Sequence, residues 1–239
     1  NGARVIGLDI AVPEFGISDF IEADLSDPAS ISSALEAMPD RIDSLCNCAG
    51  LPPRPGLETK ILAVNFIGTR ALTTGLEARL STGASIVNLA SRAGANWRSG
   101  VDQVKRLFRI EMEELGRFVL DEQIDPVRAY DLSKEAIILW TMANSERVAA
   151  KGVRVNSVSP GAIETRILDD FANAFGERMA RNVSRAGRTG TPKEVAQLVA
   201  FLLSDASTWI KGTDISIDGG MSAFTATDAL DLGDLTDQI

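Results

Sequence analysis

The sequence predicts an α/β fold in which helices cover both faces of a doubly wound, Rossmann-like parallel sheet. Several short apolar runs lack a clean alternation of apolar and polar residues, as is typical of strands buried on both faces. Segments with helical periodicity separate these runs, which is the pattern of successive βα units. With 239 residues, 45% hydrophobic and 24% charged, and no repeat or low-complexity linker, the chain is expected to form a single domain.

Gly, Asp, Asn or Pro bounds each candidate strand, because these residues end a strand in a turn. Six strands are expected: Arg4 to Asp9, Phe20 to Glu22, Ser44 to Ala49, Ser85 to Ala90, Val153 to Ser159 and Asp214 to Ile217.

Start signals locate the helices between these strands. Asp27-Pro28 begins a helix that extends to about Ala37, and Thr191-Pro192-Lys193-Glu194 is a capping box for a helix ending near Leu203. A third helix is expected from about Leu132 to Ala150. Between residues 101 and 119 the apolar residues form one helical stripe.

The charge balance is acidic, with 33 Asp and Glu against 24 Lys and Arg and a net charge of −9. Such a surface repels phosphate backbones and anionic membranes, so neither nucleic acid nor a membrane is an expected partner. The sequence has no apolar stretch long enough to span a bilayer and no signal-peptide pattern, which predicts a cytoplasmic protein. Residues 222–239 carry four Asp and no basic residue; they are interpreted as a solvated acidic tail or, alternatively, a partner-binding arm.

The chain contains no histidine, which removes the commonest general base, the commonest metal ligand and every Ser-His or Cys-His system. Cys46 and Cys48 are the only cysteines. At positions i and i+2 of a strand they would form a strained disulfide, so they are interpreted as reduced packing residues. No metal site is predicted, because further ligands are missing nearby.

Tyr130, the only tyrosine, precedes Lys134 by four residues in a helical pattern, which places both side chains on one helix face. A neighbouring ammonium favours the phenolate and would bring the hydroxyl into use as an acid or base. Ser91 ends a predicted strand, where sites of open α/β sheets lie. The alternatives are a surface Tyr beside a solvated Lys, and a Ser that only caps a turn.

Five motifs in order resemble the short-chain dehydrogenases/reductases over nearly the whole chain. They are Asn47-Cys48-Ala49-Gly50, Ser91, Tyr130-x-x-x-Lys134, Pro160-Gly161 and Ile217-Asp218-Gly219-Gly220. Within that family, the stretches Leu45 to Gly50, Ser85 to Asn88 with Trp97, and Lys134 to Ala136 with Trp140 are most similar to the coniferyl-alcohol dehydrogenase and 3α-hydroxysteroid dehydrogenase/carbonyl reductase branch.

The resemblance implies that Tyr130 exchanges the proton, Ser91 orients the carbonyl or alcohol, and Lys134 binds the ribose and tunes the phenol. Asn65 would hold a proton-relay water; the alternative is a helix-interior Asn satisfied by the backbone. Asp9 ends the first strand, where an acid can bind both ribose hydroxyls and would repel a 2′-phosphate, so NAD is expected rather than NADP. The resemblance implies cofactor contacts by Asp9, Asp24, Leu25, Asn47, Ala49, Gly50, Tyr130, Lys134, Pro160, Gly161, Ile163 and Thr165.

Two departures from the family pattern stand out. The Gly-rich phosphate turn is absent together with the first βα unit, so we expect that residues upstream of Asn1 are missing from this sequence. Tyr130 follows Ser91 by 39 residues, about 26 more than is usual in the family. This insertion, at about residues 99–124, is expected to be a substrate lid or an altered dimer interface, because its apolar stripe must cover something.

The expected organisation is a dinucleotide-binding catalytic domain over residues 1–221 followed by the acidic tail. The leading function is an NAD-dependent alcohol dehydrogenase or carbonyl reductase that acts on a bulky apolar, aromatic allylic or steroid-like small molecule. Oligomerisation as a homodimer or homotetramer is expected from the resemblance. The alternatives are a nucleotide-sugar epimerase or dehydratase, which shares the Tyr-x-x-x-Lys pair, and a non-catalytic NAD-binding protein.

Overall fold

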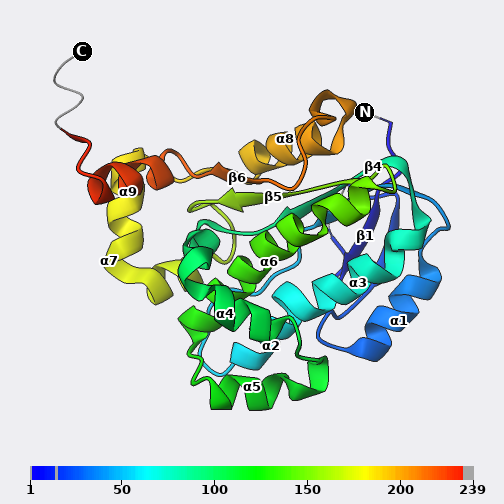
Figure 1. Ribbon diagram of the computed structural model, residues 1–239, viewed down its shortest axis with the longest axis horizontal. Helices are drawn as coiled ribbons and strands as arrows, with labels where there is room; N and C mark the ends of the chain where they lie inside the picture. Colours follow the sequence, from blue (N-terminus) through cyan, green and yellow to red (C-terminus); the bar gives the residue numbers. More distant parts are fainter. Residues whose placement is uncertain (1, 14–15, 234–239) are drawn as a thin grey trace.

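The computed structural model describes residues 2–13 and 16–233, and Figure 1 shows their arrangement as a layered α/β molecule. The elements in order are β1 (Ile6–Asp9), β2 (Asp19–Glu22), α1 (Pro28–Ala37), β3 (Ile42–Asn47), α2 (Glu58–Leu62), the π-helical turn η1 (Ala63–Gly68), α3 (Thr69–Leu76), η2 (Glu77–Arg79), β4 (Leu80–Leu89), η3 (Arg92–Asn96), α4 (Trp97–Leu107), η4 (Met112–Glu114), α5 (Leu115–Asp121), α6 (Pro126–Ala149), β5 (Arg154–Pro160), α7 (Leu168–Ala186), α8 (Pro192–Leu203), η5 (Asp205–Ser207), β6 (Asp214–Ile217) and α9 (Met221–Ala229).

All six predicted strands form, and every pairing among them is parallel. Strands β3, β4, β5 and β6 make one four-stranded sheet in that order, whereas β1 and β2 pair separately. The predicted α/β class is confirmed, but the sheet is divided, because no strand within the described ranges pairs with both β1 and β3. Residues around Leu25, Ile31 and Leu72 form an apolar cluster that packs against both parts.

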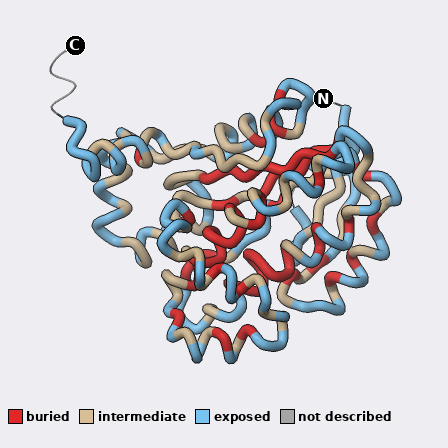
Figure 2. The backbone as a smooth tube through the Cα atoms, in the orientation of Figure 1, coloured by how far each residue is buried: buried red, intermediate tan, exposed pale blue. Residues whose placement is uncertain are grey.

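Helices cover both faces of the four-stranded sheet because adjacent residues of β4 point to opposite sides. Ile86 packs with Val148 of α6 on one face. Val87 packs with Val199 and Leu202 of α8 on the other face. Figure 1 shows α8 and α6 on opposite sides of β5, and Figure 2 shows that the buried backbone runs along the sheet and into α6. Apolar and polar residues therefore do not alternate along such a strand, because helices cover both faces of the sheet.

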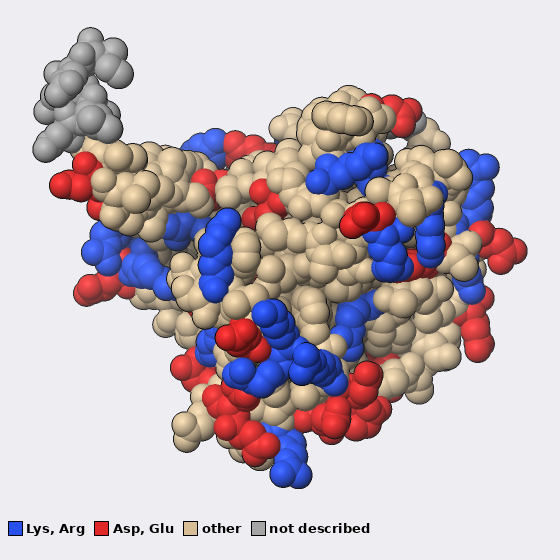
Figure 3. Space-filling model, viewed as in Figure 1, with Lys and Arg blue, Asp and Glu red and all other residues tan. Residues whose placement is uncertain are grey.

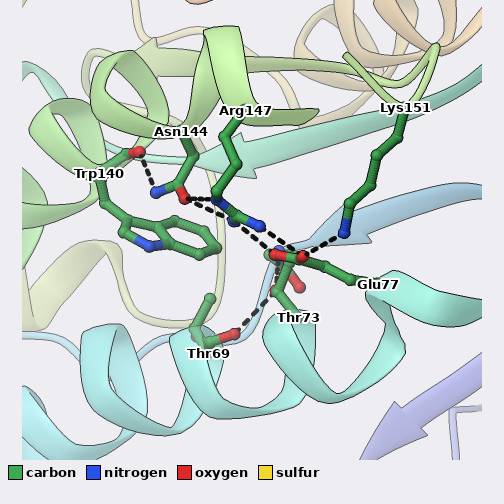
Figure 4. Close-up of polar contacts among 8 residues, drawn as sticks. Thr69, Thr73, Glu77, Trp140, Asn144, Arg147 and Lys151 are labelled. Atoms are coloured by element: carbon green, nitrogen blue, oxygen red, sulfur yellow. Dashed lines mark hydrogen bonds and ion pairs between the residues drawn. The ribbon is translucent and has the colours of Figure 1, made fainter. Parts of the chain in front are cut away.

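An ion pair joins the C-terminal end of α6 to η2, the turn that follows α3, and Figure 4 shows it in close-up. The Arg147 guanidinium donates two hydrogen bonds to the Glu77 carboxylate, at 2.6 and 2.5 Å, and Lys151 adds a third at 3.2 Å. These cations lower the pKa of Glu77. One turn earlier in α3, Thr73 Oγ1 accepts a hydrogen bond from Asn47 of β3. The two contacts fix α3, and with it the neighbouring turn η1, relative to the sheet.

The insertion at residues 99–124 forms two helices, α4 and α5, rather than one continuous stripe-bearing helix. The helical path breaks after Leu107, and a capping box between Glu111 and Glu114 starts the next turn. Apolar residues of both helices, Val104 and Phe118 among them, are buried in the cluster formed with α2 and α6 of the same chain. The stripe therefore covers the chain's own core, and no residue of 99–124 lines the main cleft of the described structure.

The start of the predicted acidic tail is a helix, α9. Asp228 of α9 forms an ion pair with Arg185 of α7, and Thr225 accepts a hydrogen bond from Arg92. These contacts hold α9 against α7 and η3, although most of residues 222–229 are exposed to solvent; a separate acidic tail over 222–239 stays a prediction. The rest of the tail, from residue 234, lies outside the described residues.

Gly94 allows η3 to approach α6 closely enough to place the preceding Ser91 beside that helix. A Cβ atom at Gly94 would lie 2.8 Å from Ile138 Cδ1 and 2.9 Å from the Lys134 carbonyl oxygen. We expect Gly94→Ala to lower the free energy of unfolding by about 1 to 3 kcal/mol through overpacking. Chemical denaturation would measure this loss. Gly116→Ala in α5, where a Cβ meets nothing within 4 Å, is the control; equal stabilities of the two variants would contradict the prediction.

Candidate active site

Ser91, Tyr130 and Lys134 come together at the carboxyl end of β4, as the sequence predicts. Ser91 follows β4 and caps η3, and its hydroxyl hydrogen-bonds to the Tyr130 phenol. One helical turn further along α6, Lys134 Nζ donates a hydrogen bond to the Leu89 carbonyl oxygen at 2.9 Å. The same ammonium lies 5.6 Å from the centre of the Tyr130 ring. A hydroxyl, a phenol and an ammonium therefore share one edge of the sheet.

The phenol is not shifted towards phenolate in this structure, contrary to the effect expected from the neighbouring lysine. Burial raises the pKa of Tyr130 to about 12, and the hydrogen bond from Ser91 opposes this rise only in part. Desolvation penalises the charged form, and the Tyr130 side chain is only 7% exposed. Tyr130 is therefore a neutral proton donor at neutral pH.

Burial also changes the protonation of Lys134, whose pKa falls to about 8. Loss of water disfavours the ammonium, and the Cys48 thiolate partly offsets that loss. With 6% of its surface exposed, the side chain has one fixed acceptor, Leu89 O. An ammonium carries three donors, so it can serve a further acceptor in the cleft.

Asn65 lies in η1, where the π-helical turn directs its amide away from the helix interior. Its Oδ1 accepts a hydrogen bond from the Leu51 backbone N–H at 2.7 Å, and its Nδ2 donates to Leu51 O and to Ser133 Oγ of α6. The Asn65 amide thus ties the loop after Gly50 to the catalytic helix. A Cβ at Gly50 would lie 3.4 Å from Asn65 Oδ1 and 3.6 Å from Lys134 Nζ, so the bare glycine leaves room beside both groups.

A cleft of about 960 Å³ opens in front of these residues, between the strand ends and helices α7 and α8. This volume is within the range of small-molecule and cofactor sites. Seven of the residues predicted to contact a cofactor line it: Gly50, Tyr130, Lys134, Pro160, Gly161, Ile163 and Thr165.

The remaining predicted cofactor residues do not line the cleft. Asp9 is exposed at the carboxyl end of β1, beside Glu22 of β2 in the register, and Ala49 is exposed next to Gly50. Asp24 accepts two hydrogen bonds from Ser26.

Two others of this group lie in the interior of the fold. Leu25 is buried in an apolar cluster. The Asn47 amide is hydrogen-bonded to Thr73 and Asn88 inside the fold, which directs it away from the cleft. The sequence motif gave no sign of this direction, because the direction depends on Thr73 and Asn88, which are distant from Asn47 in the sequence.

Two aromatic side chains of α7 stand over Tyr130. The Phe171 ring packs edge-on against Tyr130 with centroids 5.1 Å apart, and Phe175 stacks on Phe171 at 6.2 Å. Both line the cleft. Both rings also pack against the core cluster around α6.

Asp131 is a cleft residue that the sequence reasoning missed. Its Oδ1 is buried without a hydrogen-bond partner among the described residues, and burial raises its pKa to about 6 although Arg178 and Arg128 oppose the rise. The residue directly follows Tyr130, so only its buried position, which sequence does not reveal, distinguishes it from an ordinary surface acid.

Asp131 should make the stability of the protein depend on pH. Its folded pKa of about 6 exceeds the model value of 3.8, so the native state holds this proton more tightly and loses stability as pH rises through that interval. We expect Asp131→Asn to gain about 1 to 3 kcal/mol near pH 8 and almost nothing near pH 4. Denaturation midpoints at both pH values measure the effect, with exposed Glu146→Gln on the same helix as control. A gain that is independent of pH would refute the prediction.

The described residues contain neither a cluster suited to a metal ion nor a helix suited to cross a membrane. No three His, Cys, Asp or Glu side chains in the described ranges gather where they could bind a metal ion. None of the described helices combines the length and the apolar character needed to cross a bilayer. On the face shown in Figure 3, acidic and basic side chains are intermixed around the lower helices rather than gathered by sign.

Comparison with known proteins gives relatives along almost the whole chain. A family model described as "Enoyl-(Acyl carrier protein) reductase" matches residues 116–222. The coniferyl-alcohol dehydrogenase of Pseudomonas sp. (strain HR199 / DSM 7063) is 34% identical over 93% of this chain and 88% of its own length. The 3-alpha-hydroxysteroid dehydrogenase/carbonyl reductase of Comamonas testosteroni is 32% identical over 93% of this chain and 88% of its own length.

A solved structure extends the similarity to the fold. The 3-alpha-hydroxysteroid dehydrogenase from Pseudomonas sp. B-0831, complexed with NADH, superposes with a TM-score of 0.82 at 31% identity, covering 94% of this chain and 89% of that chain. The similarity in sequence and structure therefore agrees with the motifs and with the geometry of Ser91, Tyr130 and Lys134. The chain belongs to the short-chain dehydrogenase/reductase family of oxidoreductases.

Proposed function

We propose that the protein is an NAD-dependent oxidoreductase that interconverts a bulky, aromatic or steroid-like alcohol and its carbonyl, with Tyr130 as general acid and base. The observation that carries this proposal is the placement of the Tyr130 phenol against Ser91 and Lys134 at the wall of a cleft large enough for a cofactor and a substrate. Function as a homodimer or homotetramer stays a prediction from the family resemblance.

The chain's own groups are suited to moving one proton at one oxygen. Ser91 hydrogen-bonds to the phenol and can orient a substrate oxygen beside it. Because the pKa of Tyr130 is about 12, the neutral phenol is ready to donate its proton to a carbonyl oxygen. Alcohol oxidation needs the phenolate as base, so its rate should rise with pH in the alkaline range.

The residues at the strand ends fit a dinucleotide. Gly50 and Lys134 line the cleft beside each other. Lys134 has donors left beyond its bond to Leu89 and offers them to a ribose. When bound, NAD would supply the hydride acceptor or donor. Asp9 and Glu22 end neighbouring strands, and two carboxylates there support NAD over a cofactor that carries a 2′-phosphate.

The aromatic wall supports an aromatic or other flat apolar substrate. Phe171 and Phe175 present stacked rings to the cleft beside Tyr130. Such rings favour a substrate with a planar apolar body through burial and ring stacking. The two curated relatives are named for a coniferyl alcohol and for a 3-alpha-hydroxysteroid, and both names fit this class.

Replacing Tyr130 with Phe tests the proposed proton transfer. The change removes only the hydroxyl and keeps the ring against Phe171. We expect kcat to fall by about 10² to 10⁴, measured as formation of reduced nicotinamide from NAD with a panel of aromatic alcohols and 3-hydroxysteroids.

The control for Tyr130→Phe is NAD binding by calorimetry, which should change little because Lys134 and Gly50 remain. Wild type and variant with equal kcat on every accepted alcohol would refute Tyr130 as the acid and base. NAD binding without turnover by the wild type on the whole panel would favour the non-catalytic alternative.

Phe171→Ala tests the substrate class. Removing this ring should raise KM for an aromatic alcohol by about tenfold, since one lost aromatic contact corresponds to about 1.5 kcal/mol, and should affect a short aliphatic alcohol less. Phe201→Ala, at a partly exposed position of α8, is the matched control. Equal increases for both alcohols would argue against an aromatic subsite.

A further inference from the structure

The two cysteines of the chain meet at the carboxyl end of β3. Cys46 is the penultimate residue of that strand, and Cys48 is the first residue beyond its end. Their Sγ atoms are 3.1 Å apart, and both residues line the main cleft. Because β3 ends at Asn47, Cys48 lies outside the strand geometry from which a strained disulfide is expected.

The surroundings of the two thiols differ. Cys46 is half-buried and packs among the apolar residues between the sheet and α8. Cys48 is exposed and faces the Lys134 ammonium. The interpretation as packing residues therefore holds for Cys46 and is wrong for Cys48.

The same surroundings distinguish the thiols as nucleophiles. The hydrogen bond between the two thiols and the attraction of Lys134 both lower the pKa of Cys48, while burial opposes them. The pKa of Cys46 is raised by the same hydrogen bond and by burial. Cys48 is thus the thiol that ionises more readily and Cys46 the one that keeps its proton, the arrangement of an attacking and a resolving thiol.

We propose that Cys46 and Cys48 form a redox-active dithiol that reacts with low-molecular-weight disulfides at the cofactor end of the cleft. The Cys48 thiolate attacks one sulfur of the small disulfide; a Cys48–sulfur bond forms, the disulfide bond breaks and a small thiolate leaves. Cys46, having lost its proton to solvent, then attacks Cys48 Sγ and releases the second small thiolate. The dithiol loses two electrons and two protons, and one small disulfide becomes two thiols.

Closure should alter the adjoining loop. A disulfide bond is about 2.05 Å long, so the sulfurs must approach each other by about 1 Å, and Cys48 is joined through Ala49 to Gly50. Gly50 lies against Asn65 and Lys134. Oxidation also removes the thiolate that faces the Lys134 ammonium. If the proposed function is right, the oxidised protein should bind NAD less tightly, and by linkage bound NAD should protect the dithiol by the same factor.

The test is incubation of the full chain with glutathione disulfide under native conditions, followed by acid quenching and intact mass measurement. The wild type should lose two hydrogen atoms, retain no glutathione and recover on treatment with dithiothreitol. Cys46→Ser should stop with one glutathione on Cys48. Cys48→Ser should react at least about tenfold more slowly, because its remaining thiol is mostly protonated.

Three results would overturn the proposal: a wild type that accumulates the mixed disulfide without closing, thiols that do not react, or a Cys48→Ser variant as fast as Cys46→Ser.

A parallel incubation with NAD tests the coupling between NAD binding and oxidation of the dithiol. If calorimetry shows that NAD binds the reduced protein but gives no protection, the coupling is wrong. If NAD does not bind even the reduced protein while the disulfide still forms, the proposed function fails and the dithiol stands.

Discussion

The structure depends on the need to satisfy the polar side chains that α6 buries. Buried polar groups cost free energy unless they are hydrogen-bonded, and α6 finds a partner for several of them on a different element. Lys134 is bonded to the end of β4, Ser133 to Asn65 of η1, and Thr141 to Asn88 of β4. Because these bonds link α6 to the strand end and to the π-helical turn, the arrangement that completes the interior also sets the positions of the groups around Tyr130.

The electrostatics of the cleft follow from the same burial. A lysine beside a phenol would favour phenolate in water, yet here desolvation outweighs that attraction, and the pKa values of Tyr130 and Lys134 move in the directions that reduce charge. Both groups are therefore close to neutral in mildly alkaline solution. A charge that develops on Tyr130 or Lys134 is therefore poorly screened by water and has a large effect on its neighbours.

The motifs could be predicted from the sequence because they depend on local spacing. Four residues between Tyr130 and Lys134 imply one helix face, and a strand-end Ser91 implies the same edge of the sheet. What could not be predicted depends on contacts between distant segments. The direction of the Asn47 amide is set by Thr73 of α3 and Asn88 of β4, and Asp131 lies in a cleft that α7 lines. No local pattern encodes either placement. The separation of the β1–β2 pair from the four-stranded sheet likewise depends on which strands pair with each other, and strand pairing joins distant segments of the chain.

The π-helical turn η1 has a consequence for how this chain tolerates length changes. Six residues occupy a wider turn there, an arrangement that helices rarely adopt and that often accompanies functional sites. Deleting one residue would restore ordinary α-helical winding and rotate everything before it by about 100° relative to α3. Asn65 would then lose its bonds to Leu51 and Ser133. The segment is therefore a place where a shorter chain would form a more regular helix and a poorer enzyme.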